Sequence, residues 1–257
     1  MKHNNDVYPL PILSGQHNFR DLGGIPSAFS GHILPGLLFR SGDLHSLTDD
    51  DVARLERMGL SMIIDFRSDS ERQKRPNRLI RTVKEILLLP IHDEPRALAA
   101  DYVRENNADG LNGLLVLEYS RIIRNYVDEY RQFIHALSHS PNLPVVFQCS
   151  AGKDRTGLAA LFLLTALGVE EDEILRDYYA TNHYARAHAT EIIGMLNDDG
   201  YNGEIMMPLL EVRPEYLEAG LSEISKSHQS LDNFVFRVLQ ADSLKLRQRF
   251  LSQKSVQ

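Results

Sequence analysis

The chain of 257 residues contains a single cysteine, at position 149. One cysteine excludes an intrachain disulfide and a cysteine-based zinc cluster, and it is compatible with a reducing compartment. Apolar runs are also short, and the run at 158–164 falls far below the ~20 residues of a membrane-spanning helix. We therefore expect no disulfide scaffold and no integral membrane segment.

Positive charge is scarce as well. Lys and Arg total 28 against 35 Asp and Glu, which gives a formal net charge of -7. Such a chain is a poor default binder of nucleic acid, because neutralising phosphates requires clustered Lys and Arg. The N-terminal sequence MKHNNDVYPLPILSGQ lacks the apolar core and cleavage pattern of a secretory signal. We expect a cytoplasmic protein, or one exported by a signal-free route.

No internal repeat and no linker-like stretch divides the chain, so we expect a single domain over residues 1–257. Residues 1–16 are predicted to form an N-terminal arm. Residues 92–112 are polar and irregular, and they are predicted to form a loop or a mobile lid with marginal helix. Residues 186–230 are predicted to form a helical insertion or a second lid.

Strand patterns fall in the first part of the chain and helical spacing dominates the rest. Short strands are predicted within 18–24, 36–44, 61–66, 83–91 and 145–150. Helices are predicted at 47–59, with Thr48 as N-cap and Gly59 as the stop, and over 114–138. The segment 156–168 is apolar on all faces, which indicates a buried central helix. This order predicts an α/β fold, a mostly parallel central sheet flanked by helices, with extra C-terminal helices.

The most informative segment is VVFQCSAGKDRTG, at 145–157. A buried strand ends at Cys149, a short loop follows, and a helix begins near Thr156. Inward-pointing loop amides and the positive end of the helix dipole form an anion site, onto which Arg155 can place its two-pronged guanidinium. The same positive field favours the thiolate form of a cysteine at the base of the site. A thiolate below a bound phosphoryl group is placed for in-line attack, which gives a cysteinyl-phosphate intermediate.

Other interpretations of this segment are weaker. A nucleotide-binding P-loop is excluded, because Phe147 and Asp154 stand where that motif needs glycine and a hydroxyl residue. A phospho-ligand binding module without catalysis is the main alternative function. A redox or sulfur-transfer enzyme is a third, although a lone cysteine would need an external thiol to complete its cycle.

The segment resembles the active-site loop of the cysteine-based protein tyrosine phosphatase superfamily. It is most similar to the bacterial and fungal family whose loop has the pattern Cys-x-x-Gly-Lys-Asp-Arg-Thr-Gly, a family that includes secreted mycobacterial and listerial phosphatases active on phosphotyrosine and phosphoinositides. The segments NFRDLGG, LFRSGDL, DFRSDSER, LLPIHD and RPEYLEAGLSEI resemble the family's pattern in the same order. The similarity extends over residues 12–251.

This resemblance implies a protein-tyrosine phosphatase that uses no cofactor and no metal. It implies a phosphotyrosine protein or a phosphoinositide as substrate, with dual specificity as an open alternative. Cys149 and Arg155 are the expected catalytic pair. The expected phosphate-binding residues are those of the loop: Ser150, Ala151, Gly152, Lys153, Asp154, Arg155 and Thr156. One residue departs from the superfamily pattern, because Gln148 stands where histidine commonly precedes the cysteine.

The leaving group needs a proton, which a carboxylic acid on a different loop usually donates. The candidates in this sequence are Asp93, Asp154, Asp65 and Glu94. By resemblance, Asp93 at the end of the LLPIHD segment is the family's general acid, and Asp154 has a role in activity or in phosphoinositide recognition. From the residues alone, Asp93 is equally an exposed loop carboxylate, and Asp154 equally an ion-pair partner that holds the loop.

Three Phe-Arg pairs occur at strand ends and contribute Arg20, Arg40 and Arg67. Asp residues are near each of them, so a buried Arg–Asp network is favoured over a basic wall around the site. Lys153 is expected to bind phosphate or a second anion.

Overall fold

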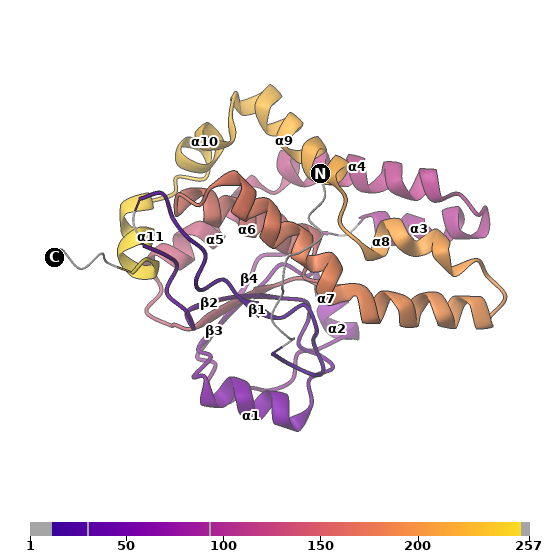
Figure 1. Cartoon of the computed structure of the whole chain (residues 1–257), viewed down its shortest axis with the longest axis horizontal. Coiled ribbons are helices and arrows are strands. Elements are labelled where there is room, and N and C mark those ends of the chain that lie inside the picture. Colours follow the sequence, from indigo (N-terminus) through magenta and orange to yellow (C-terminus); the bar gives the residue numbers. More distant parts are fainter. Residues whose placement is uncertain (1–11, 30, 93, 253–257) are drawn as a thin grey trace.

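The computed structural model describes residues 12–29, 31–92 and 94–252, and their strands form one five-stranded sheet (Figure 1). The strand order is β1-β2-β5-β3-β4, with β1 antiparallel to β2 and the other neighbours parallel. The predicted mostly parallel α/β sheet is thereby confirmed. The bounds are β1 (Arg20–Asp21), β2 (Leu38–Ser41), β3 (Met62–Asp65), β4 (Glu85–Leu88) and β5 (Val145–Gln148).

Helices make up most of the rest of the described chain. They are α1 (Asp49–Arg57), α2 (Asp69–Lys74), α3 (Glu94–Arg104), α4 (Ala108–Asn125), α5 (Val127–His139), α6 (Asp154–Ala166), α7 (Glu171–Asp198), α8 (Met207–Leu210), α9 (Pro214–His228), α10 (Leu231–Asn233) and α11 (Ser243–Phe250). A 3-10 turn η1 (Gly203–Met206) precedes α8, and a π-helical turn η2 (Phe234–Val238) follows α10.

Alternate residues of the strands face two different hydrophobic layers, as the period of a β-strand requires. Ile64 and Phe147 pack with α4, α5 and α6 in the larger layer, whereas Ile63 and Val146 pack with α1 in the smaller one. Figure 1 shows α1 on one side of the sheet and α5 and α6 on the other. Helix α6 is buried along nearly its whole length, which confirms the predicted central helix.

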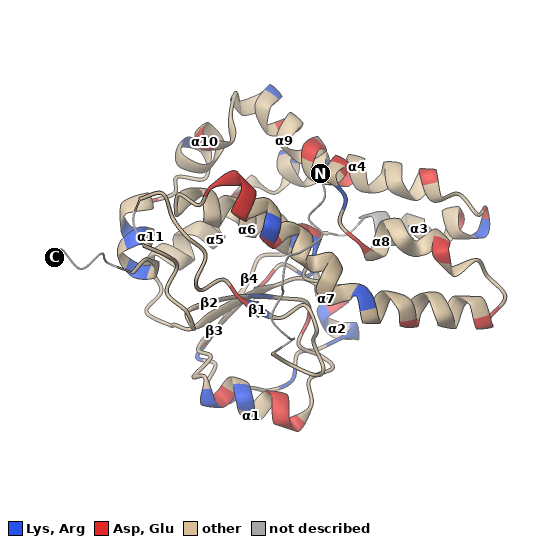
Figure 2. Ribbon diagram, in the orientation of Figure 1, with Lys and Arg blue, Asp and Glu red and all other residues tan. Residues whose placement is uncertain are grey.

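Helix α1 begins where the sequence predicts. The Thr48 hydroxyl accepts from the Asp51 amide at 3.1 Å, and the Asp51 carboxylate accepts from the Thr48 amide at 3.0 Å. This reciprocal pair is a capping box. Gly59 follows the helix with a φ of 71°, a conformation that glycine adopts without steric cost. Acidic residues in the first turn and basic residues in the last complement the helix dipole (Figure 2).

The prediction that 92–112 is an irregular loop with only marginal helix is wrong for most of that segment, whereas its role as a lid stays a prediction. It contains α3 and the start of α4, separated by only a short turn that includes Asn106 at a φ of 54°. The Asn107 side chain caps α4 by accepting from the Gly110 amide at 2.8 Å. Ala99 and Leu111 are buried against Ile205, a residue about a hundred positions away, so the local sequence does not reveal what stabilises these helices.

The predicted single helix over 114–138 is also wrong. The chain leaves helical geometry at Tyr126, with φ -125° and ψ 35°, and forms α4 and α5 on either side. The 3.6-residue apolar spacing continues across the break, and no Gly or Pro marks it. The Tyr126 hydroxyl accepts from the His92 amide and from Arg121 at 3.4 and 3.3 Å, contacts that appear only in three dimensions.

The segment 186–230, predicted as a helical insertion or a second lid, comprises the last part of α7, η1, α8 and all of α9, and α9 packs along α4. Together with α3, the end of α7 and α8 extend to one side of the sheet (Figure 1). Of the predicted arm, only residues 12–16 are described, and the amides of Ser14 and Gly15 donate to the Asp51 carboxylate at 2.9 and 2.8 Å.

Candidate active site

The carboxyl ends of three parallel strands meet at one edge of the sheet, where α/β folds commonly bind ligands. Strand β5 is followed directly by Cys149, β2 by Gly42 and Asp43, and β3 by Phe66 and Arg67. The Cys149 side chain is almost fully buried, with 2% of its residue surface exposed. The sheet thus places the single cysteine at the start of a loop that connects β5 to the N-terminus of α6.

Three successive carbonyl groups of this loop are held from outside. The Asp43 amide donates to the Ser150 carbonyl at 2.9 Å, Asn18 Nδ2 to the Ala151 carbonyl at 2.8 Å, and Arg40 Nη2 to the Gly152 carbonyl at 2.9 Å. In a planar trans peptide the next N–H points the opposite way. The amides of residues 151–153 therefore face away from these donors, alongside the unsatisfied N–H groups of the first turn of α6.

Gly152 is required at its position for two reasons. Its φ is 71°, and a Cβ there would lie 2.4 Å from the backbone of Ser41 and of Gly42. No L-residue with a side chain fits this close approach between the loop and the end of β2. Glycine therefore permits the loop to fold tightly around Cys149.

Arg155 extends from the first turn of α6 to a carboxylate on α2. Its Nη1 and Nη2 donate to the two oxygens of Glu71 at 2.9 and 2.8 Å, and Nη1 also donates to the Ile91 carbonyl at 2.8 Å. The Ser150 hydroxyl donates to the same carboxylate. Burial raises the pKa of Glu71, but the hydrogen bonds and charge of Arg155 outweigh it and hold that pKa well below its ordinary value. Glu71 is thus a permanent anion that orients the guanidinium.

Glu71 was not among the site residues predicted from the sequence. The S-x-x-E spacing of Ser68 and Glu71 signals a helix N-terminus, and the structure forms that capping box. The contact with Arg155, 84 positions away, has no signal in a single sequence.

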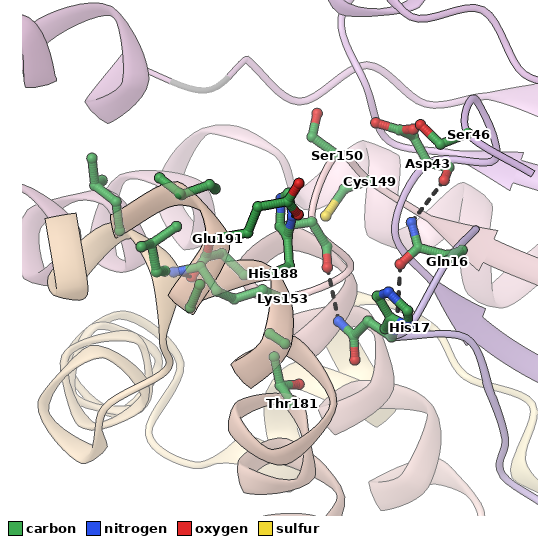
Figure 3. Close-up of a pocket in the computed structure, with 18 of the residues that line it drawn as sticks. Gln16, His17, Asp43, Ser46, Cys149, Ser150, Lys153, Thr181, His188 and Glu191 are labelled. Carbon is green, nitrogen blue, oxygen red and sulfur yellow. Dashed lines mark hydrogen bonds and ion pairs between the residues drawn. The ribbon is translucent and has the colours of Figure 1, made fainter. Parts of the chain in front are cut away.

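A cavity of about 830 Å³ opens over the loop (Figure 3). Cys149 and Ser150 line it together with Gln16 and His17 from the N-terminal segment, and Figure 3 shows Asp43 and Ser46 beside them. Helix α7 contributes the opposite wall. Of the seven predicted phosphate-binding residues, five line this cavity: Ser150, Ala151, Lys153, Asp154 and Arg155. The predicted nucleophile, Cys149, lines it as well.

Lys153 and Asp154 form a buried polar cluster next to the loop. Lys153 Nζ lies 3.1 Å from Asp154 Oδ1 and donates to the Glu211 carbonyl at 2.9 Å. The Tyr119 hydroxyl donates to Asp154 Oδ1 at 2.9 Å, and Tyr178 is hydrogen-bonded to Tyr119. Burial, followed by the Asp154 charge, raises the pKa of Tyr119 well above its ordinary value, so Tyr119 stays a hydrogen-bond donor. Asp154 therefore has a loop-holding ion pair and also faces the cavity.

Residues flanking the cysteine complete the surroundings of the loop. Gln148 Nε2 donates to Asp65 Oδ2 and to Asn77 Oδ1, both at 3.0 Å. Asp65 is buried and pairs with Arg67, and it does not line the cavity, which removes it as a general acid. The Thr156 hydroxyl is fully buried and has no hydrogen-bond partner among the described residues. Asp93 and the side chain of Glu94 lie outside what the structure describes.

The prediction of a buried Arg–Asp network is confirmed, with one partner that the sequence did not identify. Arg20 Nε lies 2.9 Å from Asp177 Oδ1, and Arg40 pairs with the other oxygen of the same carboxylate. Asp177 is on α7, about 137 positions beyond Arg40. Since Arg40 also donates to Gly152, the network links α7 to the loop.

Replacing Asp177 by Asn is expected to lower the free energy of unfolding by about 3–5 kcal/mol, because two buried guanidiniums lose their anion. Burial raises the pKa of Asp177, but Arg20 and Arg40 outweigh it and lower that pKa. The stabilisation is therefore complete above the unfolded carboxyl pKa of about 4. It fades as the pH falls through the lower folded-state pKa.

Urea titrations between neutral and acidic pH measure this effect. Asp128→Asn is the control, because Asp128 pairs with Arg131 with 76% of its side chain exposed, and its loss is expected to cost below about 1 kcal/mol. Equal destabilisation by the two variants at pH 7 would contradict the assignment.

Residues 12–29, 31–92 and 94–252 contain no group of three or more His, Cys, Asp or Glu side chains placed to hold a metal ion. Over the same residues, no helix combines the length and the apolar character needed to span a membrane.

Comparison with known proteins identifies the family. A model of the tyrosine phosphatase family matches residues 11–252. A Cupriavidus necator protein named as a tyrosine-protein phosphatase is 31% identical over 237 residues, covering 91% of this chain and 86% of the relative. The triple specificity protein phosphatase PtpB of Mycobacterium tuberculosis is 32% identical over 257 residues, covering 87% of this chain and 91% of the relative. A crystal structure of P. aeruginosa TpbA in complex with pTyr matches with 20% identity and a TM-score of 0.29, over 60% of this chain and 75% of that chain.

The family model extends over nearly the whole chain, and both curated relatives exceed 30% identity over most of their length. The resemblance seen in the sequence is thereby confirmed: this protein belongs to the tyrosine phosphatase family.

Proposed function

We propose that this protein is a cysteine-dependent protein-tyrosine phosphatase that works without a metal and through a cysteinyl-phosphate intermediate. The observation that carries the proposal is the loop around Cys149, whose three carbonyls are held outward so that its amides face the other side. Those amides, the N-terminus of α6 and Arg155 supply the positive charge that a phosphoryl dianion requires. The whole chain, 1–257, acts as one phosphatase domain in this proposal, and its cytoplasmic location remains a prediction.

In the first step the Cys149 thiolate attacks phosphorus from the side opposite the ester oxygen. The S–P bond forms as the P–O bond to the leaving group breaks, and an acid delivers a proton to that oxygen. The loop amides and the Arg155 guanidinium bind the equatorial oxygens, where charge is spread in the transition state. Through its two hydrogen bonds with Arg155, Glu71 holds the guanidinium in the orientation in which it faces those oxygens.

In the second step water attacks the phosphocysteine, and the carboxylate left by the acid takes a proton from that water. The new P–O bond forms as the S–P bond breaks, which releases inorganic phosphate and restores the Cys149 thiolate. The leaving group is now the Cys149 sulfur, which benefits from a hydrogen-bond donor. Thr156 is a candidate because its buried hydroxyl has no hydrogen-bond partner among the described residues, Cys149 included, and is therefore available to the departing sulfur. We propose that it donates to the sulfur.

Hydrolysis of p-nitrophenyl phosphate tests the proposal. Activity that persists in excess chelator and disappears in Cys149→Ser supports a cysteine-dependent phosphatase. Binding of phosphotyrosine without turnover would instead support the alternative, a catalytically weak phospho-ligand binding module.

Glu71→Gln is expected to reduce kcat/KM for p-nitrophenyl phosphate about 10-fold, because Arg155 loses a charge-assisted acceptor worth about 1.5 kcal/mol. Inhibition by inorganic phosphate should weaken by a similar factor, a change that a purely structural role for Glu71 would not produce. Asp69→Asn on the same helix is the matched control, because 83% of the Asp69 side chain is exposed. Unchanged phosphate inhibition in Glu71→Gln would show that Glu71 does not position Arg155.

The identity of the general acid is tested by the leaving group. If Asp93 is the acid, Asp93→Asn should slow phosphotyrosine hydrolysis about 10²-fold but affect p-nitrophenyl phosphate little, since a tyrosine phenolate with a pKa of about 10 needs the proton more. It should also flatten the basic limb of the pH–rate profile. If Asp154 is the acid, Asp154→Asn shows this pattern instead. Because Asp154 lines the cavity, kcat at saturation is the quantity to compare.

The range of substrates is a separate proposal. The similarity to a phosphatase named for triple specificity supports activity beyond phosphotyrosine, on phosphoserine and phosphothreonine or on phosphoinositides.

A further inference from the structure

The cavity over the loop is much larger than its anion site. A volume of about 830 Å³ is typical of sites that enclose a whole drug-sized ligand. A phosphoryl group and one phenol ring therefore fill only part of it, and the remainder is available to groups next to the phosphorylated residue.

The wall facing the loop carries a cluster of aliphatic side chains, beside the polar Thr181, His188 and Glu191 of α7. Helix α7 presents residues at helical spacing toward the cavity, and α4, η1 and α8 complete the wall with further aliphatic side chains. Ile192 and Leu210 are only partly buried and belong to none of the packed hydrophobic clusters, so the cavity is what they face. The aliphatic wall consists of Leu115, Ala185, Ile192, Met206, Leu209 and Leu210.

The described cations that line the cavity all have carboxylate partners. Arg75 lies 2.9 Å from Asp43, Lys153 lies 3.1 Å from Asp154, and Arg155 is paired with Glu71. Glu191 adds another carboxylate from α7, and Figure 3 shows it on the same side as His188. Beyond the loop itself, the described lining therefore offers no surplus positive charge to a second phosphate.

We infer that the aliphatic wall binds an aliphatic side chain next to a phosphotyrosine, so that the preferred substrate is a tyrosine-phosphorylated peptide rather than a polyphosphorylated inositol lipid. This inference rests on the proposed phosphatase function of the same site. An aliphatic neighbour that packs on the aliphatic wall removes the apolar surface of both from water. A second phosphate on an inositol ring would instead find Arg75 already paired with Asp43 and would be repelled by the Glu191 carboxylate.

Pairs of phosphotyrosine peptides test the preference for an aliphatic neighbour. The two peptides of a pair differ only in having Leu or Ser at one position that flanks the phosphotyrosine, and each flanking position is examined in turn. With the full-length protein, kcat/KM is expected to favour Leu at one or more positions by about 10-fold, the discrimination that a hydrophobic pocket achieves. In Ile192→Asp that preference should fall within about 2-fold of unity. Met195→Asp places the same charge on α7 at an exposed residue outside the cavity lining and should retain the preference.

Two results would overturn the inference. One is a wild-type protein that hydrolyses p-nitrophenyl phosphate but shows no preference for Leu at any position; the proposed phosphatase function then stands without the subsite. The other is faster turnover of a phosphatidylinositol bisphosphate in phosphatidylcholine vesicles than of every peptide, which would assign the site to lipids. Absence of p-nitrophenyl phosphate hydrolysis would refute the phosphatase function itself, and the subsite with it.

Discussion

Cys149→Ser is expected to reduce kcat for p-nitrophenyl phosphate by about 10⁴-fold or more, as removal of a covalent nucleophile does in other enzymes. The change exchanges one atom, and the buried site has room for it, so the loop and its external hydrogen bonds should persist. Serine ionises far less readily than cysteine and is a poor nucleophile without an adjacent base.

The binding site should survive this substitution. Phosphotyrosine is expected to bind Cys149→Ser with an affinity near the wild-type KM, measured by calorimetry, because the amides and Arg155 remain. Retention of more than about one hundredth of the wild-type kcat would indicate a water-attack mechanism that does not use the cysteine.

Arg155→Lys is expected to reduce kcat/KM by about 10³-fold although the charge is kept. A lysine ammonium is a point donor, and it cannot present the planar pair of N–H groups that follows a phosphoryl group to its transition state. It also cannot contact both oxygens of Glu71, which Arg155 does at 2.9 and 2.8 Å.

The split between kinetic constants distinguishes this role from simple charge attraction. Loss of transition-state contacts lowers kcat, whereas loss of ground-state attraction alone raises KM. Near wild-type kcat/KM in Arg155→Lys would show that Arg155 does not hold the phosphoryl group.

Features encoded by neighbouring residues were predictable from the sequence. The Thr48 cap and Gly59 stop of α1, the five strand patterns and the buried helix α6 all appear where local pattern places them. The link from Cys149 to Arg155 is local too, because both belong to one strand-loop-helix segment. The residues of such a segment are close in the sequence, so their relative positions follow from local geometry alone.

Features that depend on distant partners were not predictable. Glu71 meets Arg155 across 84 positions, and Asp177 meets Arg40 across 137. The same limit applies to α3, whose Ala99 packs against Ile205. It applies also to the break at Tyr126, whose hydroxyl accepts from the amide of His92, 34 positions away. A single sequence states which carboxylates exist but not which arginine each one will face.

Trapping the intermediate tests the central claim most directly. The protein is mixed with excess p-nitrophenyl phosphate and quenched within the steady state by a denaturant at mildly alkaline pH, because the S–P bond of a phosphocysteine is labile in acid. It is then digested at that pH and analysed by mass spectrometry. We predict one phosphoryl group on the thiol of the peptide that contains Cys149, absent when the denaturant precedes the substrate and absent in Cys149→Ser. Two results would contradict the account. One is a wild-type protein that turns over under these conditions and carries its phosphoryl group on another residue. The other is a wild-type protein that releases a burst of p-nitrophenolate before the steady state but leaves Cys149 unmodified.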